Sequence, residues 1–302
     1  MLTDADRLRH RLSGEFARES VAYCAIVPDE RSVYLLYAWV DAADVAGYAF
    51  AIYRADGPEP AYFARREGIP AAGQDFDDWH VGGLHVRVGE DFTRAEVTYA
   101  DDEYRVELTF EAIHDAFDYG SNVTGCPPYQ ATNRYEQGGV IRGTLERNGM
   151  IVEFDGPGHR DHSWGRRDWS AIHHYKWLSI VGEDRAANIM VALVEGETLY
   201  NGYIFRDGLL SGIVRADIET GYSADRFQDA ITVVALDEAG RSTTLEFPER
   251  FASARWDYSP TVNFTDTGMT GTLHGGVVHA YIQYVWPCAY LDRMLAAAAV
   301  GR

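Results

Sequence analysis

The chain has 302 residues and carries 27 basic against 46 acidic side chains, a formal net charge of −19 at pH 7. This balance excludes nucleic-acid binding and an electrostatic hold on anionic membranes, because both need a basic face and no Lys/Arg run occurs. Aromatic residues make up 13% of the chain, which favours β-structure around an aromatic-lined interior. A neutral or hydrophobic small molecule is therefore the expected ligand or substrate.

Cysteine usage and hydropathy predict a cytoplasmic protein. The three cysteines, Cys24, Cys126 and Cys288, are too few and too dispersed for a disulfide framework or a clustered zinc site. The first 20 residues are charged rather than apolar, so we expect no secretion signal. No run of about 18 apolar residues is present to span a bilayer. A homodimer is an open alternative to a monomer.

The N-terminal segment predicts a short charged helix over Asp4–Glu19, because Leu8, Leu12 and Phe16 recur at intervals of four. Alternating strand patterns follow, separated by clusters of Asp, Gly and Pro. They cover Ser32–Val40, Ala49–Tyr53, Leu84–Val88, Ala95–Tyr99 and Tyr104–Phe110.

The clearest hairpin is centred on Asn148-Gly149. Two alternating stretches, Val140–Leu145 and Met150–Phe154, flank this pair. Asn-Gly supplies the positive φ angles that a two-residue hairpin turn requires. We therefore expect two antiparallel strands paired outward from this turn.

The second half repeats the pattern of short strands without intervening helices, and its apolar tail Ala289–Val300 predicts a closing helix. Strands spaced about 8–12 residues apart indicate a sandwich or barrel, so the predicted class is all-β. The predicted strands are Lys176–Val181, Ala187–Val194, Leu199–Phe205, Leu209–Ile218, Ala230–Ala235, Thr243–Phe247, Phe251–Tyr258 and Met269–Trp286.

Chemistry is concentrated in one segment, Gly156–Trp169. It holds two histidines, three arginines, two aspartates and two tryptophans beside three glycines. Buried charges must be paired, so this density is costly in an ordinary core. We expect one side of the segment to face a pocket.

The pattern Gly-x-Arg-Asp-His-Ser-Trp-Gly-x-Arg-Asp-Trp over 158–169 follows Tyr135-Glu136-Gln137 and the Gly139–Asp155 hairpin. Together they resemble the lipocalin-like superfamily of carotenoid 1,2-hydratase (hydroxyneurosporene synthase) and AttH-like proteins. The resemblance implies two consecutive lipocalin-like (calycin) barrel halves, which we place at 1–155 and 156–302.

The resemblance further implies a cofactor-independent catalyst for a terpenoid, steroid, polyketide or aromatic substrate. His162 and Trp164 match active-site positions of the hydratase branch. The acidic proton donor that this branch carries on the next strand has no counterpart here, where Asn188-Ile189-Met190 stands.

The residue types assign further roles. His162 can serve as acid or base near neutral pH, with Asp161 or Asp168 to orient the imidazole and Glu136 as an additional acid. Alternatively, the arginines, aspartates and tryptophans plug one end of a barrel, with Glu136 as an ion-pair partner for an arginine. The predicted substrate-binding residues are Trp164, Trp169 and Tyr135 through their π-faces, Arg160 and Arg167 through bidentate contacts, and His174.

Three function classes remain open. The first is acid/base catalysis by a hydratase, lyase, isomerase or cyclase, with no metal or other cofactor. The second is a non-catalytic carrier of a hydrophobic ligand, a common role of such barrels. The third is an iron oxygenase in which His159, Asp161 and either His274 or His279 form a facial triad.

Overall fold

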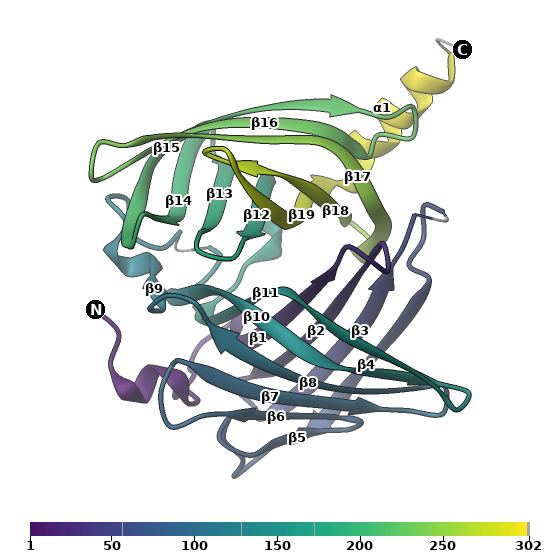
Figure 1. Cartoon of the computed structure of the whole chain (residues 1–302). Helices are drawn as coiled ribbons and strands as arrows, with labels where there is room; N and C mark the ends of the chain where they lie inside the picture. Colours follow the sequence, from purple (N-terminus) through teal and green to yellow (C-terminus); the bar gives the residue numbers. More distant parts are fainter. Residues whose placement is uncertain (56, 128, 172, 301–302) are drawn as a thin grey trace.

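Two consecutive β-barrels make up the molecule (Figure 1). The computed structural model describes residues 1–55, 57–127, 129–171 and 173–300. Within these residues there is one α-helix, at the C-terminal end of the chain. The predicted all-β class with two barrel halves and a closing helix is confirmed.

The first barrel is an antiparallel sheet of 11 strands that coils until β3 contacts β5. Its strand order is β4-β3-β2-β1-β11-β10-β8-β7-β6-β5, and β9 pairs with β10. The strands are β1 (Ala17–Val27), β2 (Ser32–Asp41), β3 (Val45–Tyr53), β4 (Tyr62–Pro70), β5 (Trp79–Val81), β6 (Leu84–Val88), β7 (Arg94–Ala100), β8 (Tyr104–Ala112), β9 (Phe117–Asp118), β10 (Asn133–Arg147) and β11 (Met150–Arg166).

The second barrel is closed, and each of its eight strands pairs with the next in sequence. Helix α1 (Cys288–Val300) follows the last strand and projects away from the barrel (Figure 1). No helix in the described part of the chain is long and apolar enough to cross a membrane. The strands are β12 (His174–Val181), β13 (Ala186–Val194), β14 (Glu197–Arg206), β15 (Leu209–Tyr222), β16 (Gln228–Asp237), β17 (Ser242–Ser259), β18 (Val262–Leu273) and β19 (Gly276–Pro287).

The predicted helix over Asp4–Glu19 is wrong. Only a 3₁₀ turn, η1 (Asp4–Arg7), forms there, and β1 already begins at Ala17. The rest of the segment is tied to the first barrel by tertiary hydrogen bonds. For example, the backbone N–H of Arg9 donates to Asp75 at 2.8 Å, and the Arg9 guanidinium donates to Asp44 at 2.7 Å. These bonds take the place of helical ones.

The predicted hairpin at Asn148-Gly149 is confirmed, with φ angles of 53° and 76° at the two turn residues. The strands extend far beyond the predicted stretches. β11 runs unbroken through the predicted boundary at 155/156 and stays paired with β1 as far as Arg166. The chain therefore leaves the first barrel after Arg166 and enters the second at His174, and the short turn η3 (Trp169–Ala171) lies between the two.

The two faces of the central strands serve two different cores. Along β1, Val21 and Tyr23 pack inside the first barrel, whereas Ala22 and Cys24 pack against the second barrel. This follows from the alternation of side chains along a strand. The barrels thus meet through outer strand faces, with contacts of β1, β2, β3, β10 and β11 to β12, β13, β17 and β19.

Position 165, at the end of β11, requires glycine for two reasons: its backbone conformation and the lack of space for a Cβ. Its φ is +108°, and an added Cβ would lie 2.6 Å from the backbone nitrogen of Thr132. We expect Gly165→Ala to lower the free energy of unfolding by about 2–4 kcal/mol, because left-handed strain and overpacking add. Gly196→Ala, with φ +86° and open space around the Cβ, should cost only about 1–2 kcal/mol. Urea unfolding of both variants checks this, and equal losses would contradict it.

Candidate active site between the barrels

A cavity of about 80 Å³ lies between the outer faces of the two barrels. An ordered water needs roughly 10–15 Å³, so the cavity has room for several waters, and a larger ligand requires the lining side chains to move. Most of the lining is aromatic or aliphatic, and five lining residues carry amide or charged groups: Gln130, Arg134, Asp161, Arg167 and Gln283. The other lining residues are Ala22, Leu35, Tyr37, Ala49, Ala51, Phe63, Trp169, Tyr175, Trp177, Met190, Trp256, Tyr258, Phe264 and Tyr281.

The wall from the first barrel carries a buried ion-pair cluster. The hairpin register places Glu136 on β10 directly opposite Asp161 on β11. Nη2 of Arg134 donates hydrogen bonds to both carboxylates, and the guanidinium lies over the ring of Tyr119. Oδ1 of Asp161 is buried and has no hydrogen-bond partner among the described residues. This oxygen belongs to a residue that lines the cavity.

Glu136 does not itself line the cavity. It is fully buried behind the lining residues Arg134 and Trp177, to which it is hydrogen-bonded. Burial raises its pKa to about 7, against the opposing effect of Arg134. It accepts a hydrogen bond from Nε1 of Trp177 at 3.2 Å and lies 2.5 Å from Nε2 of His159. Burial lowers the pKa of His159 to about 3, so this imidazole is neutral near pH 7.

Behind the facing wall, which comes from the second barrel, lies a carboxyl group that the sequence analysis did not predict. Asp266 on β18 is fully buried, and its Oδ2 accepts a hydrogen bond from Nε1 of Trp256 at 3.0 Å. Among the described residues its Oδ1 has no partner at hydrogen-bonding distance, and the polar side chains around it, Gln283, Tyr53 and Tyr281, are uncharged. Burial therefore raises its pKa to about 7. Its neighbours Trp256, Tyr281 and Gln283 line the cavity.

His162 lies on the other face of β11, inside the first barrel. Successive residues of a strand point to opposite faces, so Asp161 faces the cavity and cannot orient His162. The imidazole instead contacts Glu19, with Nε2 2.7 Å from the carboxylate oxygen. Asp168 is also excluded as its partner, because it pairs with Arg166 at 2.7 Å and with Ser170.

The remaining predicted site residues divide between three places. Arg167 and Trp169 line the cavity, and the Arg167 guanidinium donates to the carbonyl oxygen of Gln130 at 3.0 Å. His174 does not line it: its ring stacks on Trp286, and burial lowers its pKa to about 4. Three lie with His162 in the first barrel: Tyr135, Arg160 and Trp164.

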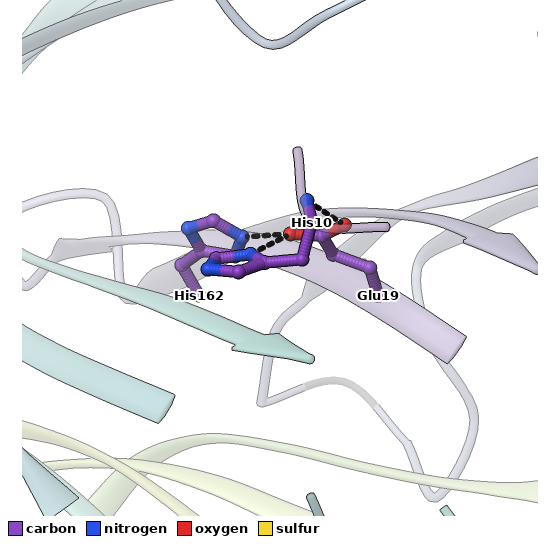
Figure 2. Close-up of side chains that lie close together, drawn as sticks. All are labelled: His10, Glu19 and His162. Carbon is purple, nitrogen blue, oxygen red and sulfur yellow. Dashed lines mark hydrogen bonds and ion pairs between the residues drawn. The ribbon is translucent and has the colours of Figure 1, made fainter. Parts of the chain in front are cut away.

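The predicted facial triad of His159, Asp161 and His274 or His279 does not form. Two groups of potential ligands lie within coordinating distance in the described ranges, and neither contains these residues. One is His10, Glu19 and His162 (Figure 2), and the other is the exposed group Asp78, His80 and His85.

The two paired barrels, with a cavity between them, define the chain as a double β-barrel protein. The chain belongs to the DUF7064 family, described as a domain of unknown function, whose model matches residues 3–276. No curated protein matches the sequence.

Solved structures share this fold at low sequence identity. A protein described as AttH from Nitrosomonas europaea is 13% identical, with a TM-score of 0.66 over 89% of this chain and 92% of that chain. CghA in complex with Sch210972 is 12% identical, with a TM-score of 0.64 over 89% and 88%. Kievitone hydratase from Nectria haematococca is 10% identical, with a TM-score of 0.60 over 95% of both chains.

Proposed function

We propose that this chain is an enzyme that transfers protons on a hydrophobic small molecule bound between the barrels, as a hydratase, lyase, isomerase or cyclase. One observation carries the proposal. Two buried carboxyl groups flank the aromatic cavity from opposite barrels: Asp161, paired with a guanidinium, lines it, and Asp266, with no cation, lies directly behind its lining residues Trp256, Tyr281 and Gln283. Environments that differ in this way give one acid and one base near neutral pH.

The charges assign the two roles. Burial raises the pKa of Asp161, but the Arg134 guanidinium, which Asp266 lacks, opposes this rise and favours the ionised form, so we assign the partner-free oxygen of Asp161 as the base. Asp266 has only neutral hydrogen-bond donors around it and keeps its proton up to about pH 7. It protonates an alkene carbon or a carbonyl oxygen, while Asp161 removes a proton from carbon or from an attacking water. The two transfers balance, and solvent returns the proton, so no redox partner is needed.

The cavity walls favour a hydrophobic, ring-containing substrate. Trp177, Trp256 and Tyr258 offer π-faces that bind apolar rings and stabilise a developing cation. The Arg167 guanidinium, which has no carboxylate partner among the described side chains, can hold a substrate oxygen. The names of two proteins with this fold, kievitone hydratase and CghA with Sch210972, fit an enzyme acting on such molecules.

A cavity-filling variant tests the location of the site. Ala51 on β3 lines the cavity, so we expect Ala51→Leu to weaken the binding of a hydrophobic ligand at least about tenfold, the equivalent of about 1.4 kcal/mol. Ligands come from a panel of terpenoid, steroid, polyketide and aromatic compounds, with tryptophan fluorescence for binding and mass spectrometry for conversion. Val234→Leu, on the exposed outer face of β16, is the control and should bind normally.

Two outcomes would count against the proposal. If Ala51→Leu binds every ligand as the wild type does, the ligand does not occupy the cavity between the barrels. If the panel yields ligands that bind in the cavity and none is converted, the chain is a carrier of a hydrophobic molecule.

A further inference from the structure

His10, Glu19 and His162 converge at one point in the first barrel (Figure 2). Oε1 of Glu19 lies 2.8 Å from Nδ1 of His10 and 2.7 Å from Nε2 of His162. Glu19 and His162 are buried, whereas His10, in the N-terminal segment, is half-buried. The cluster joins three parts of the chain: the segment before β1, strand β1 and strand β11.

Both imidazole rings are held in place by their surroundings. The His10 ring stacks on Trp164 at 3.9 Å, nearly parallel, and His162 packs edge-on against Phe76 and Tyr135. A ligand set whose rings are fixed before binding loses little rotational freedom when an ion binds.

The ring nitrogen of His10 that points away from Glu19 has a carboxylate partner, as metal-bound histidines commonly do. Its Nε2 lies 3.0 Å from Oδ1 of Asp6. If Nε2 donates to Asp6, the lone pair of Nδ1 points at the carboxylate of Glu19. Nδ1 and Oε1 of Glu19 then lie 2.8 Å apart, which requires a positive charge between them. Either a proton or a metal ion supplies that charge. A carboxylate that fixes the outer nitrogen of a ligating histidine is a common feature of metal sites.

We propose that His10, Glu19 and His162 form a binding site for a divalent d-block cation, and that Zn²⁺ fits it best. Two neutral imidazole nitrogens and one carboxylate are a donor set that zinc accepts, with water in the fourth position. Atoms about 2.1 Å from a tetrahedral zinc lie about 3.4 Å apart. The distances from Oε1 of Glu19 to the two imidazole nitrogens therefore need to lengthen by only about 0.6–0.7 Å. His10 is half-buried, so its side of the site allows this movement.

The ion would fasten the N-terminal segment to the first barrel. This inference goes beyond the proposed function, because the site lies inside the first barrel and its residues do not line the cavity between the barrels. A structural metal binds the folded chain more tightly than the unfolded chain and so raises its stability.

The test is a calorimetric titration of Zn²⁺ into the full chain after treatment with EDTA, near neutral pH. We expect one equivalent bound by the wild type, with a rise in Tm. His10→Ala should lose this binding, and Asp6→Asn should weaken it by about 10–100-fold. X-ray absorption of the zinc-loaded protein should show two imidazole ligands.

A control separates this site from the exposed group on the surface. The double variant His80→Ala with His85→Ala removes the other candidate ligands and should bind Zn²⁺ as the wild type does. Three results would each overturn the proposal: no uptake by the wild type, uptake that survives both His10→Ala and Asp6→Asn, or uptake that disappears in the double variant. Tm values measured in EDTA establish that each variant is folded.

Discussion

Asp266→Asn is expected to lower kcat by about 10²–10⁴-fold, the usual contribution of a positioned general acid, while ligand binding is retained. The amide keeps the shape of the side chain and can still accept the hydrogen bond from Trp256, but it cannot donate a proton to the substrate. Product formation measured by mass spectrometry, together with ligand affinity from fluorescence, checks both parts of this prediction.

The pH dependence follows from the same residue. Burial raises the pKa of Asp266 to about 7, and the acid must be protonated to act, so kcat/KM of the wild type should fall as the pH rises above about 7. The folded chain binds this proton more tightly than the unfolded chain. Asp266 therefore lowers stability as the pH rises from about 4 to 7, and Asp266→Asn removes this loss. Reduced turnover in the variant then cannot be attributed to unfolding.

Asp257→Asn on the adjacent strand β17 is the matched control, because Asp257 is exposed and does not line the cavity. It should leave turnover unchanged. Full activity in Asp266→Asn, or a wild-type kcat/KM that stays constant above pH 7, would remove Asp266 from the mechanism.

Arg134→Met should destabilise the fold by about 3–5 kcal/mol, the usual loss when one partner of a buried ion pair is removed. The Arg134 side chain is 6% exposed and is hydrogen-bonded to Glu136 and Asp161. Without the guanidinium, two carboxylates remain buried beside each other. Denaturant unfolding near neutral pH measures the loss.

Arg142 gives a closely matched comparison on the same strand. It also bridges two carboxylates, Glu111 at 2.8 Å and Asp155 at 3.1 Å, but its side chain is 53% exposed. Solvent screens such pairs, so Arg142→Met should cost only about 0–1 kcal/mol. Adding Glu136→Gln and Asp161→Asn to Arg134→Met should recover part of the stability by removing the uncompensated charges. Equal losses for the two arginines would contradict this account.

The sequence predicted the hairpin at Asn148-Gly149, and that turn contains more information than the sequence analysis used. Counting outward from it pairs Glu136 with Asp161 and Tyr135 with His162, as the structure has them. With side-chain alternation, the same count separates His162 from Asp161. It also places Arg134 two residues from Glu136 and on the same face. The pairing in this part of the cavity wall can therefore be predicted from the sequence.

Other features depend on contacts that no local pattern reports. Asp266 lies behind the cavity lining on β18, whose pairing with β17 contains several register shifts, so no simple count places it near the cavity. The leucines at 8 and 12 suggested helical periodicity, but the segment is held by side chains of the first barrel, such as Asp75. Glu19 bonds to His162 because β1 lies beside β11 in the sheet, although the two residues are far apart in the chain.

The central claim is that a hydrophobic molecule binds between the barrels, between Asp161 and Asp266. The most direct test is a crystal structure of the full chain with the tightest-binding compound of the panel. The account predicts that the compound contacts Trp177 and Tyr258, with its reacting atoms beside the carboxyl groups of Asp161 and Asp266. A compound bound inside the first barrel next to His162, or on the outer surface, would contradict it.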